Sequence, residues 1–211
     1  MEFRDAIHGF NEQPITKQIL LDLLKEYKRP YDKISELVRQ GILQLVKRGI
    51  YIPGPALKMA APEPFLLANH LLGPSYVSME TALAYWGWIP EKVYEVSSMT
   101  IRSSMVYNTD AGRYSYTHLP LPYYSFGLQC VKLTQKQTAM VATPEKALCD
   151  KIATTAGVLL RSANQVMELL IDDLRIDEQQ LGQIDVRMIS SWVAEAPKKS
   201  SIDMLVKTLS K

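Results

Sequence analysis

The chain has 211 residues, of which 47% are hydrophobic and 22% charged, and its formal net charge is +2. This length fits one large or two small globular domains, and such a composition excludes a wholly disordered chain. Two cysteines without a CxxC spacing exclude a disulfide framework, and no apolar stretch reaches the ~18 residues of a membrane span, so we expect a cytoplasmic protein without a membrane partner.

Basic residues are concentrated near the N-terminus. Between Lys25 and Lys58 there are eight basic and three acidic residues, an excess of five positive charges. Beyond Lys58 there are 14 basic and 15 acidic residues, so the rest of the chain is nearly neutral. This distribution favours contact of the N-terminal part with nucleic acid.

Hydrophobic spacing predicts three short helices in this part of the chain. Phe3 and Ile7 recur at helical spacing, and Thr16 is a suitable N-cap for a second helix with an apolar stripe. A third helix should begin at Pro30 and end before Gly41, because proline suits the first turn and glycine the C-terminal end.

After Gly41 the apolar residues change from helical to strand spacing. The segments 42–46 and 50–52 predict a β-hairpin whose turn, Lys47-Arg48-Gly49, needs the positive φ that glycine adopts readily. Three helices followed by a hairpin with a basic tip is the order of a winged helix-turn-helix. We therefore expect such a DNA-binding domain over residues 1–56.

A second domain, of mixed α/β structure, is expected over residues 57–211, so the predicted fold class is α+β. A linker rich in proline and glycine, 54–64, precedes it. The predicted helices are 65–72, 78–86, 143–152, 162–174, 185–194 and 200–209, and the predicted strands are 94–101, 104–107, 113–118, 128–133 and 138–142.

Binding of double-stranded DNA requires cations for the phosphates and an element that fits the major groove. The third helix fits that groove, and the hairpin tip suits the backbone or minor groove. A face of charges in water is the alternative interpretation of these residues. The expected DNA contacts are Lys28, Arg29, Tyr31, Lys33, Ser35, Arg39, Lys47 and Arg48.

Signals of catalysis are weak. There is no G-x-G and no GxxxxGK[ST] loop, and His8, His70 and His118 are isolated in the sequence. We therefore expect no metal, no cofactor and no enzymatic activity. Cys149 is expected to be a buried structural thiol.

One helix, which contains Glu145, Lys146, Asp150 and Lys151, has the carboxylates and lysine of many metal-dependent nucleases. The alternative is an amphipathic helix with Leu148 and its apolar neighbours inward and its charges in water. We prefer the amphipathic helix.

Three segments resemble the AbiEi family of antitoxins from bacterial abortive-infection systems. The stretch SELVRQGILQLVKRGIYIPG (35–54) is similar to the winged domain of that family, and 74–100 and 142–152 are similar to two segments of its C-terminal domain. The matching positions are Arg39, Arg48, Gly49 and Tyr51 in the first segment and Ser78, Ala82, Leu83, Pro144, Glu145, Lys146, Leu148 and Asp150 in the other two.

The resemblance implies a transcriptional autorepressor that binds repeats in its own operator and acts as the antitoxin of a type IV toxin-antitoxin system. The toxin it counteracts would be similar to nucleotidyltransferases, and no stable complex with it is implied. The role of Ser78, Glu145, Lys146 and Asp150 stays open, although their chemistry suggests folding.

Two other functions remain as alternatives. One is a metal-dependent nuclease that the winged domain delivers to DNA. The other is a plain transcription factor whose second domain senses a ligand or dimerises.

Overall fold

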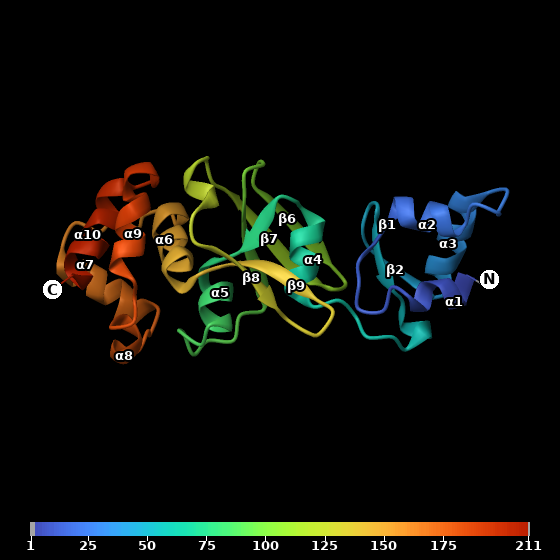
Figure 1. The fold of residues 1–211 in the computed structure, drawn as a ribbon, viewed down its shortest axis with the longest axis horizontal. Coiled ribbons are helices and arrows are strands. Elements are labelled where there is room, and N and C mark those ends of the chain that lie inside the picture. Colours follow the sequence, from blue (N-terminus) through green and yellow to red (C-terminus); the bar gives the residue numbers. More distant parts are fainter. Residues whose placement is uncertain (1–2, 211) are drawn as a thin grey trace.

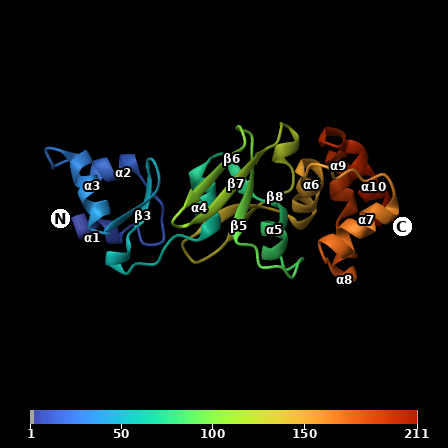
Figure 2. The ribbon, with the colours of Figure 1, turned by 180° about the vertical axis from the view of Figure 1, so that it is seen from behind.

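The computed structural model describes residues 3–210, and the chain is elongated, with three parts in sequence order along its long axis (Figure 1). The N-terminal helices and hairpin lie at one end, a six-stranded sheet lies in the middle, and the C-terminal helices lie at the other end. The view from behind shows the same order (Figure 2). Helices and mixed sheets together make the fold α+β, as predicted.

The N-terminal unit has the predicted three helices and hairpin. Thr16 caps the second helix by accepting a hydrogen bond from the backbone of Ile19 at 3.4 Å, and Gly41 and Gly49 have the positive φ expected of them, +68° and +90°. One short strand, β1, was not predicted. The elements are α1 (Phe3–His8), β1 (Ile15–Thr16), α2 (Lys17–Leu23), α3 (Pro30–Arg39), β2 (Leu43–Lys47) and β3 (Ile50–Pro53).

The three strands of this unit form an antiparallel sheet in the order β1-β3-β2. The helices bury their apolar stripes in a separate small core. This core consists of Phe3, Ile7, Ile15, Leu20, Leu24, Ile34, Leu37, Ile42 and Leu43. The stripes inferred from the sequence therefore face this core, with Ile19, Leu23 and Val38 partly buried against it.

A short 3-10 turn, η1 (Pro55–Leu57), lies in the linker that leads to the central sheet. The order of the strands is β6-β7-β5-β4-β9-β8, in which β5 and β7 are parallel, as are β4 and β9. The elements are α4 (Pro64–Leu71), β4 (Ser75–Val77), α5 (Met79–Tyr85), β5 (Glu95–Thr100), β6 (Met105–Thr109), β7 (Gly112–His118), η2 (Tyr123–Ser125), β8 (Leu128–Lys132) and β9 (Thr138–Ala142).

The predicted strands of this sheet are confirmed, but β4, one of its two central strands, was not predicted. β4 has only three residues, Ser75–Val77, and all are buried. It pairs with β5 on one side and with β9 on the other. A run this short carries too little alternation to be recognised in the sequence.

The chain ends in helices that pack against one another and against α6 at the end of the sheet (Figure 1). Ser162 caps α7 as predicted, by accepting a hydrogen bond from the backbone of Gln165 at 3.3 Å. Helix α8 was not predicted. The elements are α6 (Pro144–Thr154), α7 (Ala163–Met167), the π-helical η3 (Glu168–Asp173), α8 (Glu178–Leu181), α9 (Val186–Trp192), η4 (Val193–Glu195) and α10 (Lys199–Leu209).

The larger core spans the sheet and the C-terminal helices, and it also includes Val46 and Ile52 of the N-terminal hairpin. The domain boundary after residue 56 stays a prediction, and residues 1, 2 and 211 of the two predicted ranges lie outside the described part. Within residues 3–210, no helix has both the length and the apolar character needed to cross a membrane.

Candidate nucleic-acid interface and a buried ionic cluster

Helix α3 presents a polar face at the N-terminal end of the molecule. Pro30 occupies its first turn, and Ile34 and Leu37 point into the small core. This orientation leaves Tyr31, which is 57% exposed, and Arg39 at the surface. The predicted contact Ser35 is exposed as well, although its hydroxyl donates a hydrogen bond to the carbonyl of Tyr31 at 3.1 Å.

Two of the predicted DNA contacts, Arg29 and Lys33, form ion pairs with carboxylates of α3. Arg29 Nε lies 2.7 Å from Asp32 Oδ2, and Lys33 Nζ lies 3.0 Å from Glu36 Oε1. The hydrogen bond from Lys33 lowers the pKa of Glu36, which also accepts a hydrogen bond from Gln40. A phosphate that approached Arg29 or Lys33 would have to compete with these carboxylates.

Three other predicted cations carry no such pair. Lys28, Arg39 and Arg48 are exposed, and none of them forms an ion pair with a side chain that the structure describes. Among the predicted DNA contacts, they are therefore the cations most available to phosphate.

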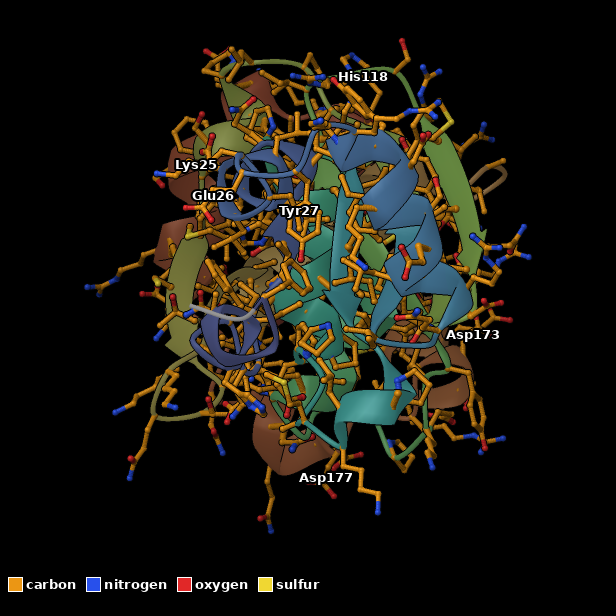
Figure 3. All side chains as sticks on the ribbon, turned by 90° about the vertical axis from the view of Figure 1, so that its right-hand side faces the viewer. Lys25, Glu26, Tyr27, His118, Asp173 and Asp177 are labelled. Atoms are coloured by element: carbon orange, nitrogen blue, oxygen red, sulfur yellow. The ribbon has the colours of Figure 1, made fainter. Side chains whose placement is uncertain are left out.

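Aromatic side chains lie next to cations on this surface. Two of the residues involved, Lys17 and Tyr27, are not among the predicted DNA contacts. Lys17 Nζ lies 4.7 Å from the centre of the Tyr31 ring, and Lys33 Nζ lies 5.6 Å from that of Tyr27. Figure 3 looks onto this end of the molecule, and Tyr27, which is 44% exposed, stands on the face turned toward the viewer. Lys17 belongs to α2 and lies outside the basic stretch 25–58, whereas Tyr27 lies within that stretch but carries no charge.

The predicted position of Lys47 is wrong. We expected it beside Arg48 at an exposed tip, but its side chain is half-buried against the central sheet. Its Nζ donates hydrogen bonds to the carbonyl of Leu71 and to the hydroxyl of Tyr107, both at 2.8 Å. Only Arg48 remains exposed at the tip, so Lys47 is not positioned to bind phosphate.

The second prediction that fails concerns helix α6. We expected its charges in water, but Glu145 is 7% exposed and both Lys146 and Asp150 are fully buried. Thr143 caps the helix and Pro144 occupies its first turn, as predicted. Helix α6 packs against α5, α9 and α10, which leaves Glu145, Lys146 and Asp150 away from water, while Lys151 stays partly exposed.

Asp150 and Lys146 form the centre of a buried ionic cluster with Ser78, Tyr76 and Tyr123. Lys146 Nζ lies 2.9 Å from Asp150 Oδ1. The other carboxylate oxygen, Oδ2, accepts hydrogen bonds from Ser78 at 2.7 Å and Tyr76 at 2.9 Å. Lys146 also donates to the carbonyl of Tyr123 at 2.9 Å, and its Nζ lies 3.3 Å from the centre of that ring.

Burial dominates the protonation equilibria of this cluster. It raises the pKa of Asp150 and lowers that of Lys146, while each charge opposes the shift of the other. Ser78 and Tyr76 also oppose the shift of Asp150, because their hydroxyls donate to the ionised carboxylate. Since both side chains are fully buried, the pair contacts protein groups and not solvent.

The neighbouring charges of α6 have their own partners. Glu145 accepts a hydrogen bond from the backbone of Asp185 at 3.3 Å, which ties α6 to the start of α9. Lys151 forms a partly exposed ion pair with Glu80 of α5. These contacts join α6 to the start of α9 and to α5.

The remaining candidate groups are the two cysteines and the side chains that could bind a metal ion. Cys149 is buried as predicted, which raises the pKa of its thiol to about 12, whereas Cys130 is exposed. Among the side chains that the structure describes, no three of histidine, cysteine, aspartate or glutamate lie together as a metal site would require.

Comparisons with known proteins bear on the fold. No family model matches the sequence, and a search of curated proteins finds no match. Among solved structures, the chain is similar to the crystal structure of the RV2827C protein from Mycobacterium tuberculosis, with a TM-score of 0.62 and 19% sequence identity. The match covers 99% of this chain and 76% of that chain. At this identity the similarity establishes a common fold alone.

Proposed function

We propose that this chain is a DNA-binding transcriptional autorepressor and the antitoxin of a type IV toxin-antitoxin system. In this proposal residues 3–53 form a winged helix-turn-helix that binds double-stranded DNA of the protein's own promoter. The remaining part counteracts a nucleotidyltransferase-like toxin in the cytoplasm, without a stable complex with it.

The observation that carries the DNA-binding part is the exposed polar face of α3 beside a hairpin with a basic tip. α3 packs its apolar stripe inward and leaves Tyr31 and Arg39 outward, which is the arrangement a helix needs to enter a major groove. Lys28 precedes this helix, and Arg48 stands at the hairpin tip, where phosphates would lie. The excess of positive charge between Lys25 and Lys58 supports the same conclusion.

The antitoxin part of the proposal rests on the segments that resemble the AbiEi family. Segment 74–100 contains Tyr76 and Ser78, segment 142–152 contains Lys146 and Asp150, and these four side chains meet in the buried ionic cluster. A role in folding explains why these residue types occur in both segments. The resemblance therefore concerns the architecture of the second domain. The antitoxin activity is inferred from that resemblance.

The geometry of α6 argues against the nuclease alternative. Metal-assisted cleavage of DNA requires carboxylates that a metal ion and a phosphodiester can reach. Asp150 is fully buried and Glu145 is 7% exposed. The plain transcription factor shares the DNA-binding part of the proposal, so only the test with a toxin separates it from an antitoxin.

Binding of the full-length protein to its own promoter DNA tests the first part. We expect Lys28→Ala and Arg48→Ala each to weaken binding and to lower the logarithmic salt slope by ~0.9, the contribution of one phosphate contact. Lys199→Ala, which removes an exposed charge at the far end of the molecule, is the matched control and should leave both quantities unchanged. Binding that is independent of salt, or absent, would refute the DNA-binding proposal.

Rescue of cells that express a neighbouring nucleotidyltransferase-like gene tests the second part. The double variant Lys28→Ala with Arg48→Ala should lose repression of a promoter reporter and keep the rescue. If this variant stays folded and no longer rescues, DNA binding itself carries the antitoxin effect. If even the native protein fails to rescue, the plain transcription factor is favoured.

A further inference from the structure

The hairpin of the N-terminal unit packs against the central sheet. The pairing of β2 with β3 shifts register between Leu45 and Lys47, which is the irregularity of a β-bulge. A bulge redirects the side chains that follow it. Leu43, before the shift, belongs to the small core, whereas Val46, within it, belongs to the large core together with Ile52 of β3.

Lys47 joins the hairpin tip to the central part of the molecule through two hydrogen bonds. Its ammonium donates to the Leu71 carbonyl at the end of α4 and to the Tyr107 hydroxyl of β6, and it lies 4.3 Å from the centre of the Tyr107 ring. The ring itself packs edge-on against Tyr116, with centroids 5.8 Å apart. The charge is therefore bound at a fixed point of the sheet.

A second contact joins the two parts at a distance from the hairpin. Glu12 accepts hydrogen bonds from Thr134 at 3.2 Å and from Gln137 at 3.1 Å. Gln137 is buried, and its side-chain oxygen accepts a hydrogen bond from the backbone of Glu63 in the linker at 2.7 Å. Two separate contacts restrict rotation about the linker more than one contact would.

We propose that Lys47 is a positioning residue for DNA binding, which fixes the hairpin on the sheet so that Arg48 is held where it can meet DNA. This inference rests on the proposed function. According to this inference, α4 and the central sheet support the DNA-binding surface, because Leu71 of α4 and Tyr107 of β6 hold the hairpin in place. Holding a side chain in its bound orientation reduces the entropy lost on binding.

A double-mutant cycle with promoter DNA tests the inference in the full-length protein. Lys47→Met should weaken binding at least about fivefold, the lower end of typical coupling between sites. Tyr107→Phe, which keeps the ring and removes the acceptor, should weaken binding in the same direction, and the two changes together should do little more than Lys47→Met alone. The salt slope should stay at its native value in all three variants.

Lys92→Met and Tyr94→Phe are the matched controls. They also form a lysine–tyrosine pair, with Nζ 5.4 Å from the ring centre, but Tyr94 is 83% exposed and lies away from the hairpin contact. These two variants should bind DNA as the native protein does. If Lys47→Met instead lowers the salt slope by ~0.9 and Tyr107→Phe has no effect, Lys47 binds phosphate and the inference is wrong.

A measurement without DNA separates this inference from the proposed function. Nitrogen-15 relaxation should give residues 3–53 and the central sheet one common correlation time in the native protein, and a shorter time for residues 3–53 in Lys47→Met. Independent tumbling in the native protein would overturn the inference even if DNA binds. If the native protein tumbles as one body but binds no promoter DNA, the proposed function fails, and with it the role of Lys47 in DNA binding.

Discussion

Replacing Asp150 by asparagine removes one charge of the buried ionic cluster with almost no change in shape. The variant leaves the ammonium of Lys146 fully buried beside the Tyr123 carbonyl and the rings of Tyr123 and Tyr76. Removing one member of a buried ion pair typically costs ~3 to 5 kcal/mol, because the remaining charge is left uncompensated. Since whole domains are stable by only ~5 to 15 kcal/mol, we expect a large fraction of the stability to be lost.

The reverse change, Lys146→Met, should destabilise the protein by a similar amount. It leaves the carboxylate of Asp150 with the hydroxyls of Ser78 and Tyr76 as donors. The two changes combined should cost less than the sum of the single changes, because neither charge is then left alone.

Urea unfolding followed by circular dichroism measures these free energies. Lys151→Met is the matched control on the same helix, since its ion pair with Glu80 is partly exposed and worth at most ~1 kcal/mol. If Asp150→Asn were as stable as Lys151→Met, the cluster would not stabilise the fold. That result would also reopen the possibility that Asp150 is retained for chemistry.

Three further predictions concern single groups. Gly54→Ala should cost ~1 to 3 kcal/mol in urea unfolding, because the added Cβ would lie 2.1 Å from the carbonyl oxygen of Gly41. Iodoacetamide at about pH 8 should modify Cys130 in the folded protein and reach Cys149 only after unfolding, which mass spectrometry of the peptides detects. Burial raises the pKa of Tyr124 to about 12, whereas an unfolded tyrosine ionises near ~10. Its contribution to stability should therefore be present below about pH 10 and be lost above it, so urea midpoints that do not fall at higher pH would contradict this reasoning.

The N-terminal unit could be predicted from the sequence because its signals are local. Thr16 and Pro30 mark the starts of helices, Gly41 and Gly49 mark turns, and each acts within a few residues of its own position. The order of three helices and a hairpin follows from these signals. Its exposed cations could be named as well, apart from Lys17, which lies in a segment without other basic residues.

The position of Lys47 could not be predicted in the same way. Its neighbours in the sequence, Arg48 and Gly49, indicate an exposed turn, and the register shift that directs it toward the sheet leaves no mark in the sequence. Its partner Tyr107 lies 60 residues further along the chain. Contacts over such separations depend on the tertiary fold.

The sequence of helix α6 contains a pattern of burial that conflicts with the prediction of charges in water. Apolar residues occupy several faces of it, at Ala147, Leu148, Cys149 and Ile152, and such a distribution is typical of a buried helix. The spacing of Lys146 and Asp150 by four residues resembles an ordinary surface pair. The partners that compensate their burial lie 23 to 74 residues away, so no local pattern indicates that both charges lie inside.

The place of β4 at the centre of the sheet bears on the order in which the chain folds during synthesis. β4 cannot be enclosed until β9 pairs with it at Val77 and Val141, so the sheet stays open until most of the chain has left the ribosome. The buried residues of the small N-terminal core, by contrast, have all emerged once Leu43 has, and only Tyr51 and Leu57 are added to it later. Early helices can therefore form first, while the hairpin acquires its final support only after Tyr107 has been made and β6 has paired with β7. A ribosome stalled between these points would present a formed N-terminal core whose hairpin is still free to move.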